Sequence, residues 1–164
     1  MDGFNLLPQR RARDELVACC AAPGWAETVA AGRPYPDVER LTATALAVLA
    51  DLPWAAVAGA LAAHPRIGER AGAGAGRDAA WSRREQAGVA GAGEEVLAAL
   101  AEANREYEKR FDRIFLIFAT GRTPEQMLAA ARERLGNDEA TERRVVRQEL
   151  AKITELRLRR LAGE

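Results

Sequence analysis

Apolar residues recur every three to four positions along most of the chain, a spacing typical of amphipathic helices. No alternating β-branched run of strand length is bounded by turn residues. We therefore expect an all-α fold, a single-domain bundle of about seven to nine helices over residues 1–164. The clearest apolar stripe lies between Pro36 and Leu52 and contains Val38, Leu41, Ala45, Val48, Leu49 and Leu52.

Prolines, glycines and capping residues indicate where these helices end. Thr123, followed by Pro124 and then by Gln126 at the third position, predicts a capping box at the start of one helix. The expected helices cover residues 11–22, 25–31, 36–52, 53–64, 94–110, 124–135 and 137–161.

The most apolar run of the chain is Ile114–Ala119. A run of this length is compatible with a buried strand or with a buried helix. Because the sequence offers no second strand for it to pair with, we expect a helix.

The chain contains a single histidine, His64, immediately before Pro65. Proline disfavours a helical conformation at the preceding residue, so His64 is expected to be the last residue of a helix or to lie just beyond it. The dipole of that helix would favour the cationic imidazole. Two interpretations stay open, a satisfied histidine at the protein surface and a group that transfers protons near neutral pH.

Seven of the 14 glycines lie between Gly68 and Gly93, where we expect a loop. The stretch Gly72–Gly76 is its loosest part. Within this stretch Ser82 and Glu85 have the spacing of a capping box, which predicts the start of a short helix at Ser82. Glu85 is then either a helix cap or an acid that takes part in chemistry.

Arg157 falls within the apolar stripe that Val146, Leu150 and Ile153 form on the last helix. One interpretation is an arginine near a helix end whose stem packs while its head reaches water. The other is a guanidinium at the edge of a cleft, where its planar fork could hold a carboxylate or a ring carbonyl.

The composition argues against several classes of function. Lysine and arginine together number 24, as do aspartate and glutamate, so no net charge favours nucleic acid or an anionic membrane. Cys19 and Cys20 are adjacent, which suits neither a mutual disulfide nor a metal site. No nucleotide-binding or metal-binding motif is present, although a magnesium site made of carboxylates alone stays open. Without a signal peptide or an apolar span we expect a cytoplasmic protein.

Several stretches together resemble the 2-oxo-4-hydroxy-4-carboxy-5-ureidoimidazoline (OHCU) decarboxylase family, which forms (S)-allantoin in urate breakdown. The most specific are Ala63–Gly68, which reads AHPRIG, followed by Ser82–Gly88, which reads SRREQAG, and later by Lys152–Leu158, which reads KITELRL. Shorter matches are Cys19–Cys20 with Trp25–Ala26, Arg33–Tyr35, Asn104 with Tyr107, Phe115–Ile117, Gly121–Thr123 and Leu135–Asp138.

The resemblance implies a cofactor-independent carboxy-lyase without a metal, usually a homodimer, that acts on a small molecule. It assigns catalytic roles to His64, to Glu85 as its acidic partner, and to Arg157. It also implies contacts with the substrate, and their expected residues are Pro65, Ser82, Gln86, Phe115, Ile117, Phe118 and Ala119. For the last four of these residues the implied contacts are made by backbone groups.

Two other functions stay open at this point. One is a catalytically silent helical binding domain of the same fold, and the other is a lyase that acts on a related ureido compound.

Overall fold

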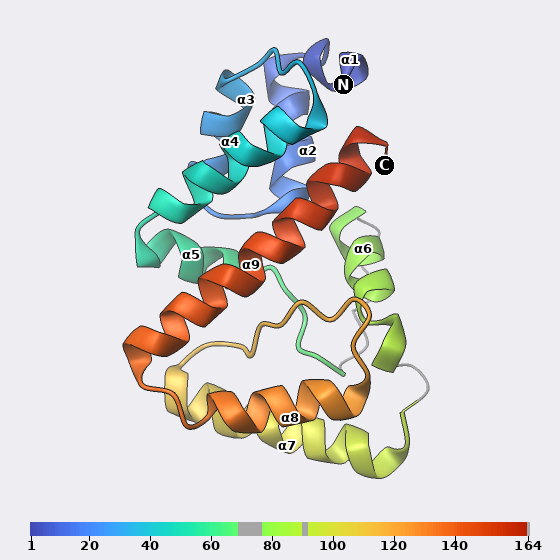
Figure 1. Cartoon of the computed structure of the whole chain (residues 1–164), viewed down its shortest axis with the longest axis vertical. Helices are drawn as coiled ribbons and strands as arrows, with labels where there is room; N and C mark the ends of the chain where they lie inside the picture. Colours follow the sequence, from blue (N-terminus) through green and yellow to red (C-terminus); the bar gives the residue numbers. More distant parts are fainter. Residues whose placement is uncertain (69–76, 90–91, 164) are drawn as a thin grey trace. The chain divides into compact units, whose positions relative to one another are not determined.

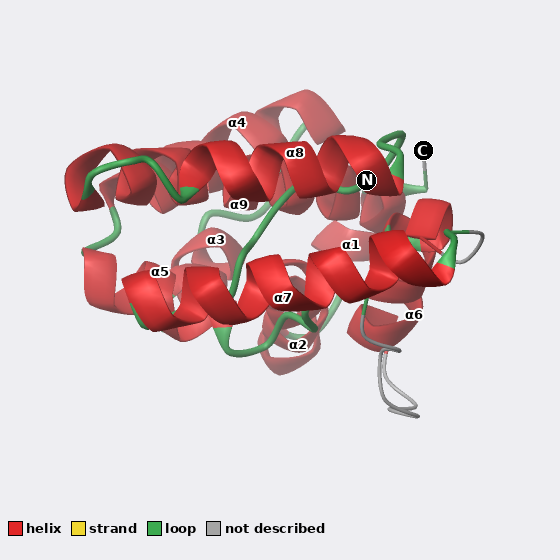
Figure 2. Cartoon of the chain, turned by 90° about the horizontal axis from the view of Figure 1, so that it is seen from below, coloured by secondary structure: helices red, strands yellow, loops and turns green. Residues whose placement is uncertain are grey.

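A computed structural model of the chain describes residues 1–68, 77–89 and 92–163. The predicted glycine-rich loop at Gly72–Gly76 lies outside these residues. Within them, the backbone forms nine α-helices and a short 3-10 helix, and no strand is present. Figure 2 shows these helices connected by loops. The predicted all-α fold is therefore confirmed.

The helices follow the chain in the order that Figure 1 labels. They are α1 (Asp2–Asn5), α2 (Gln9–Cys19), α3 (Trp25–Ala31), α4 (Val38–Asp51), α5 (Trp54–Leu61), α6 (Arg77–Glu85), η1 (Ala87–Val89), α7 (Glu94–Phe111), α8 (Pro124–Arg134) and α9 (Glu139–Ala162). No single helix in the described ranges is long and apolar enough to cross a membrane.

The described residues form two compact units. The first contains residues 1–63 and 151–163, and the second contains the described part of 64–150. Helix α9 contributes its beginning to the second unit and the rest to the first. The prediction of one domain over residues 1–164 stays a prediction.

In the first unit, α3 packs against both α2 and α4. The buried Trp25 of α3 donates its indole N–H to the carbonyl oxygen of Ala45 in α4, at 2.9 Å. Arg33 donates to the carbonyl oxygens of Phe4 and Leu7, at 3.0 and 2.7 Å. Arg33 therefore anchors the amino-terminal residues of this unit.

Most helix ends agree with the sequence. Both hydrogen bonds of the predicted capping box at α8 are present, from Gln126 N to Thr123 Oγ1 at 3.2 Å and from Thr123 N to Gln126 Oε1 at 2.9 Å. Helix α5 ends at Leu61, so of the two positions expected for His64, the structure has the one beyond the helix. Cys19 and Cys20 are both buried, and neither forms a disulfide.

The prediction of a helix at Ile114–Ala119 is wrong, because this segment is irregular and contains no helical turn. Helix α7 ends at Phe111, and its C-cap Asp112 adopts a left-handed conformation with φ of 52°. Figure 1 shows the non-helical segment running from the end of α7 to the start of α8. Side chains, rather than a helical ladder, bind its backbone at Leu116 and Phe118.

A buried polar network joins the helices of the second unit. Glu142 of α9 is 0% exposed and accepts hydrogen bonds from Tyr107 of α7 and, at 2.9 Å, from Arg134 Nε of α8. Asn137 Nδ2 donates to the other carboxylate oxygen at 2.8 Å. Burial, and then the bond to Glu142, raises the pKa of Tyr107 to about 12, so the phenol keeps the proton that it donates.

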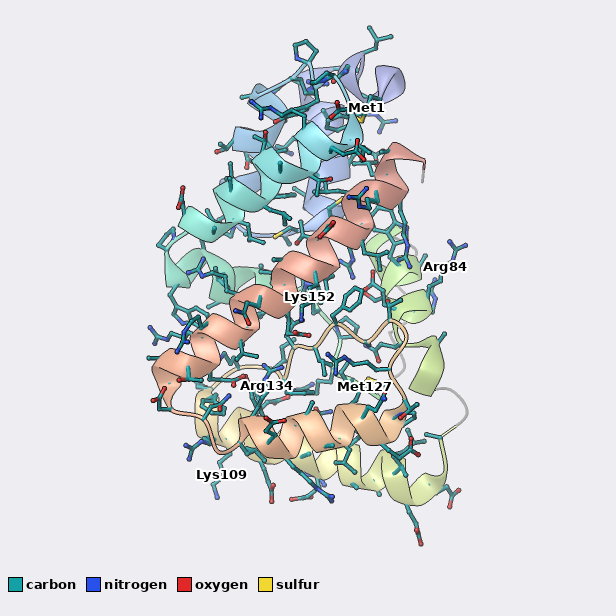
Figure 3. All side chains as sticks on the ribbon, viewed as in Figure 1. Met1, Arg84, Lys109, Met127, Arg134 and Lys152 are labelled. Carbon is teal, nitrogen blue, oxygen red and sulfur yellow. The ribbon has the colours of Figure 1, made fainter. Side chains whose placement is uncertain are left out.

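Arg134 extends this network to the irregular segment. Its Nη1 donates to the carbonyl oxygen of Leu116 at 2.7 Å, and its guanidinium carbon lies 4.6 Å from the centre of the Phe115 ring. Figure 3 shows Arg134 among the side chains of α8. The network therefore fixes the segment that follows α7, together with the helices on both sides of it.

Candidate active site

Helix α6 presents polar side chains on a buried face. Ser82 and Glu85 are 5% and 8% exposed, whereas Arg83 and Arg84 between them are exposed. Figure 3 shows Arg84 pointing away from α6. Residues three apart lie on one side of a helix, which explains why Ser82 and Glu85 are buried together. A buried hydroxyl and a buried carboxyl on one face are candidates for contacts with a ligand.

The prediction that a helix starts at Ser82 is wrong. Helix α6 already begins at Arg77, so Ser82 lies inside it and its carbonyl oxygen accepts the regular helical bond from Gln86 N at 3.1 Å. Glu85 is the last residue of the helix. The spacing of Ser82 and Glu85 thus reflects a shared helix face and not a capping box.

Gln86 connects the end of α6 to the segment that contains His64. Its Oε1 accepts a hydrogen bond from Gly68 N at 3.2 Å, and its Nε2 donates to the carbonyl oxygen of Arg66 at 3.5 Å. His64 and Pro65, directly before these backbone groups, are both half-buried. The carboxyl-terminal end of α6 and residues 64–68 are therefore brought together by one side-chain amide.

Helix α7 holds the same segment from another side. Asn104 Nδ2 donates to the carbonyl oxygen of Ile67 at 2.9 Å, and Arg66 forms a bidentate ion pair with Glu108. Asn104 is buried on the apolar face of α7. Sequence reasoning gave Asn104 no role, although a polar residue on an apolar helix face is a recognisable signal. A cavity of about 250 Å³ lies beside this segment.

Most side chains of the segment Phe115–Ala119 are buried. The side chains of Phe115, Ile117 and Ala119 belong to the apolar core of α7 and α8, so only their backbone groups are open to contact with a ligand. The backbone bonds that side chains make to this segment fall on Leu116 and Phe118. Ile117 is 4% exposed, and its N–H and C=O have no hydrogen-bond partner in the part of the chain that the structure describes.

Gly88 lies against the loop that precedes α8. A Cβ atom at Gly88 would come within 2.7 Å of the carbonyl oxygen of Arg122, closer than a van der Waals contact allows. This approach places η1, which directly follows Glu85 and Gln86, next to the end of the 112–123 segment. The family-like stretch Ser82–Gly88 thus ends at a position where a side chain does not fit.

We expect Gly88→Ala to lower the free energy of unfolding by about 1–3 kcal/mol, because the methyl group forces η1 and Arg122 apart. Urea denaturation measures this change. The matched control is Gly59→Ala in α5, whose Cβ would meet Pro23 at an ordinary 3.4 Å and which should be neutral or slightly stabilising. Equal stabilities of the two variants would contradict the close approach at Gly88.

Arg157 lies in the first unit and is 4% exposed. Its Nη1 donates to the carbonyl oxygen of Ala18 in α2 at 3.3 Å. The buried Cys20 thiol lies near Arg157 and Thr154, and burial raises the pKa of this thiol. A snorkelling arginine with its head in water does not fit this burial, so Arg157 is held within the protein near α2.

The structure thus positions the candidate residues in two groups. The second unit contains His64, Glu85 and all the expected substrate contacts, and Gln86 joins the histidine segment to the glutamate helix. Arg157 belongs to the first unit, and its role in the same reaction stays a prediction. In the described ranges, no group of three His, Cys, Asp or Glu residues has the geometry of a metal site.

A family model described as OHCU decarboxylase matches residues 5–159. The chain is 34% identical over 144 residues to the 2-oxo-4-hydroxy-4-carboxy-5-ureidoimidazoline decarboxylase of Amia calva. The matched region covers 83% of this chain and 78% of that protein. It is 33% identical over 155 residues to the uric acid degradation bifunctional protein TTL of Arabidopsis thaliana. That match covers 92% of this chain, which spans about half, 47%, of the Arabidopsis protein.

A crystal structure of OHCU decarboxylase in the presence of (S)-allantoin matches with a TM-score of 0.80 and 30% identity, over 92% of this chain and 99% of that one. A crystal structure of (S)-allantoin synthase matches with a TM-score of 0.71 over 97% of this chain and 52% of that one. At 16% identity, this second likeness supports the fold alone.

Proposed function

Since the chain belongs to the OHCU decarboxylase family, we propose that it catalyses the cofactor-independent decarboxylation of OHCU to (S)-allantoin in urate degradation. The geometric observation that carries this proposal is the bond of Gln86 to residues 66–68. Through it, the buried face of Ser82 and Glu85 is held to the segment of the only histidine.

The substrate itself supplies the means to lose CO2. The carboxylate is attached to a carbon next to a C=N bond, so the electrons of the breaking C–C bond move into the imine. The imine nitrogen takes up a proton, and the hydroxyl on the same carbon becomes a ring amide carbonyl of allantoin as the neighbouring carbon gains a proton. The protein has to orient the carboxylate, move the hydroxyl proton and protonate one face of the enol-like intermediate.

We assign these tasks to the residues that the resemblance indicates. His64 transfers the protons, and Glu85 orients its imidazole. Ser82, Gln86 and Arg157 bind the ring and the ureido group, with Pro65 against the ring. Backbone groups of Phe115–Ala119 complete the binding site. The burial of Ser82, Glu85 and Arg157 supports these roles, since polar groups withdrawn from water interact more strongly with a polar ligand.

The test is the stereochemistry of the product. OHCU is generated freshly from urate by oxidation and hydrolysis, and circular dichroism follows the formation of allantoin. We expect the protein to accelerate decay of the substrate and to form the S enantiomer in excess. Racemic allantoin formed at the uncatalysed rate would contradict the proposal and favour a silent binding domain. Activity that is restricted to another ureido compound would favour the related lyase.

The proposal includes a homodimer in the cytoplasm, for which the family resemblance is the support. Sedimentation equilibrium of the purified chain tests the dimer directly. A single species with the mass of one chain, 17.7 kDa, would contradict it.

A further inference from the structure

We infer that Glu149 is a positioning residue, which holds the backbone of Phe115–Ala119 in the conformation that binds substrate. The inference rests on the proposed function. Glu149 lies on α9 within the second unit, is 6% exposed, and accepts a hydrogen bond from Phe118 N at 2.7 Å. Sequence reasoning assigned it no role.

Among the described residues, the bond to Glu149 is one of three that side chains make to this segment. Arg134 Nη1 donates to the carbonyl oxygen of Leu116 at 2.7 Å, and Arg122 Nε donates to that of Phe118 at 3.1 Å. Arg134 and Arg122 therefore bind carbonyl oxygens, whereas Glu149 binds an N–H group. Together, the three side chains satisfy backbone groups of a segment that has no helical or sheet partner of its own.

The two peptide groups that flank Ile117 are trans, and in a trans peptide the C=O and the following N–H point in opposite directions. The N–H of Ile117 therefore points away from the Leu116 carbonyl oxygen that Arg134 binds. The C=O of Ile117 points away from the Phe118 N–H that Glu149 binds. These two groups of Ile117 have no partner within the described residues, so a donor and an acceptor stay available for an amide-like ligand such as the imidazoline ring or the ureido group.

Glu149 is suited to this role because the segment has no helical ladder of its own. Without an acceptor at Phe118, its peptide could rotate, and rotation would turn the adjacent groups of Ile117 away from the ligand. Hydrogen bonds lost in this way would weaken the binding of the substrate and of the transition state alike, so the loss falls on KM. The carboxylate thus acts on the substrate through Phe118 and does not need to touch it.

The experiment compares Glu149→Gln with Glu149→Met in the full-length protein. Glutamine keeps an oxygen that can accept from Phe118 N, whereas methionine has a similar length and no such acceptor. We expect Glu149→Met to raise KM for OHCU at least about tenfold with kcat within about threefold, because binding is lost equally in the ground and transition states. Glu149→Gln should keep KM within about threefold of the wild type.

A purely structural role predicts a different result. Loss of folded protein lowers the apparent kcat and leaves KM unchanged, as we expect for the control Val146→Ala, which removes buried methyl groups from the same helix. Hydrogen exchange of the Phe118 amide, measured by NMR, adds a readout that is independent of activity. Its protection should be lost in Glu149→Met and kept in Glu149→Gln.

The possible failures are distinguishable. If the wild type does not accelerate the reaction, the proposed function is wrong and the inference fails with it. If the wild type is active and the methionine variant keeps both its KM and the protection of the Phe118 amide, the inference alone is overturned. A raised KM in both the glutamine and the methionine variants would also overturn it, because the charge and not the acceptor would then matter.

Discussion

Replacing His64 with asparagine is expected to lower kcat for CO2 release from OHCU by a factor of about 10²–10⁴, the usual contribution of a positioned general acid or base. Asparagine is similar in size and can form hydrogen bonds, but it does not take up a proton near neutral pH. His64 is the only histidine, so no other imidazole in the chain can replace it.

The fold should survive this substitution because other side chains hold the backbone of the segment. Gln86 binds backbone groups of Arg66 and Gly68, and Asn104 binds that of Ile67. Far-ultraviolet circular dichroism and the urea midpoint should therefore stay close to those of the wild type. The rate of (S)-allantoin formation is the decisive measurement, and full turnover by the asparagine variant would refute the role of His64.

The exposed Arg84 provides the control for this measurement. Arg84→Gln changes the charge next to Glu85 on α6 but affects the solvent side of the helix. Its activity should stay within about threefold of the wild type, since exposed charges interact weakly. A loss as large as that of His64→Asn would indicate a disturbance of α6 rather than a loss of proton transfer.

Replacing Glu142 with leucine is expected to lower the free energy of unfolding by about 3–5 kcal/mol, which is the usual effect of removing one partner of a buried ion pair. The substitution leaves the Arg134 guanidinium in the interior without its carboxylate. It also removes the acceptor of the Tyr107 hydroxyl. Equilibrium unfolding in urea measures the effect.

Two further variants test whether the unpaired buried charge causes the loss of stability. Glu102→Gln removes an exposed ion pair with Arg105 and should change the free energy of unfolding by less than about 1 kcal/mol. The double variant Arg134→Met with Glu142→Leu should regain part of the lost stability, because it leaves no buried charge unpaired. If the double variant is less stable than Glu142→Leu alone, the unpaired charge is not the cause.

Local features of the sequence determine the helices to a large extent. Thr123, Pro124 and Gln126 form the predicted capping box because each of its hydrogen bonds joins residues three apart. Helix α3 has the predicted bounds, since Gly24 precedes it and Gly32 follows it. The same local patterns singled out Arg157 as a charge on an apolar face, and the side chain is indeed buried.

The tertiary structure alone decides the conformation of Ile114–Ala119. Its apolar sequence is compatible with a strand or a helix, and the choice depends on partners that are distant in the chain. Arg134 and Glu149 bind Leu116 and Phe118 from 18 and 31 positions away. The spacing of apolar residues along a sequence indicates which positions are buried. It does not show which distant side chain will form a hydrogen bond with a given backbone group.

The candidate site, too, follows partly from the sequence and partly from the tertiary structure. The sequence by itself determined which residues are chemically suited, His64 as the only histidine and Glu85 three positions after Ser82. Only the tertiary structure decided that Ser82 lies inside a helix, that Gln86 and Asn104 hold the histidine segment, and that Glu149 holds the segment at Phe118. Hydrogen bonds from side chains to the backbone of distant residues depend on how the helices pack. They cannot be predicted from the spacing of apolar residues or from motifs of residues close in sequence.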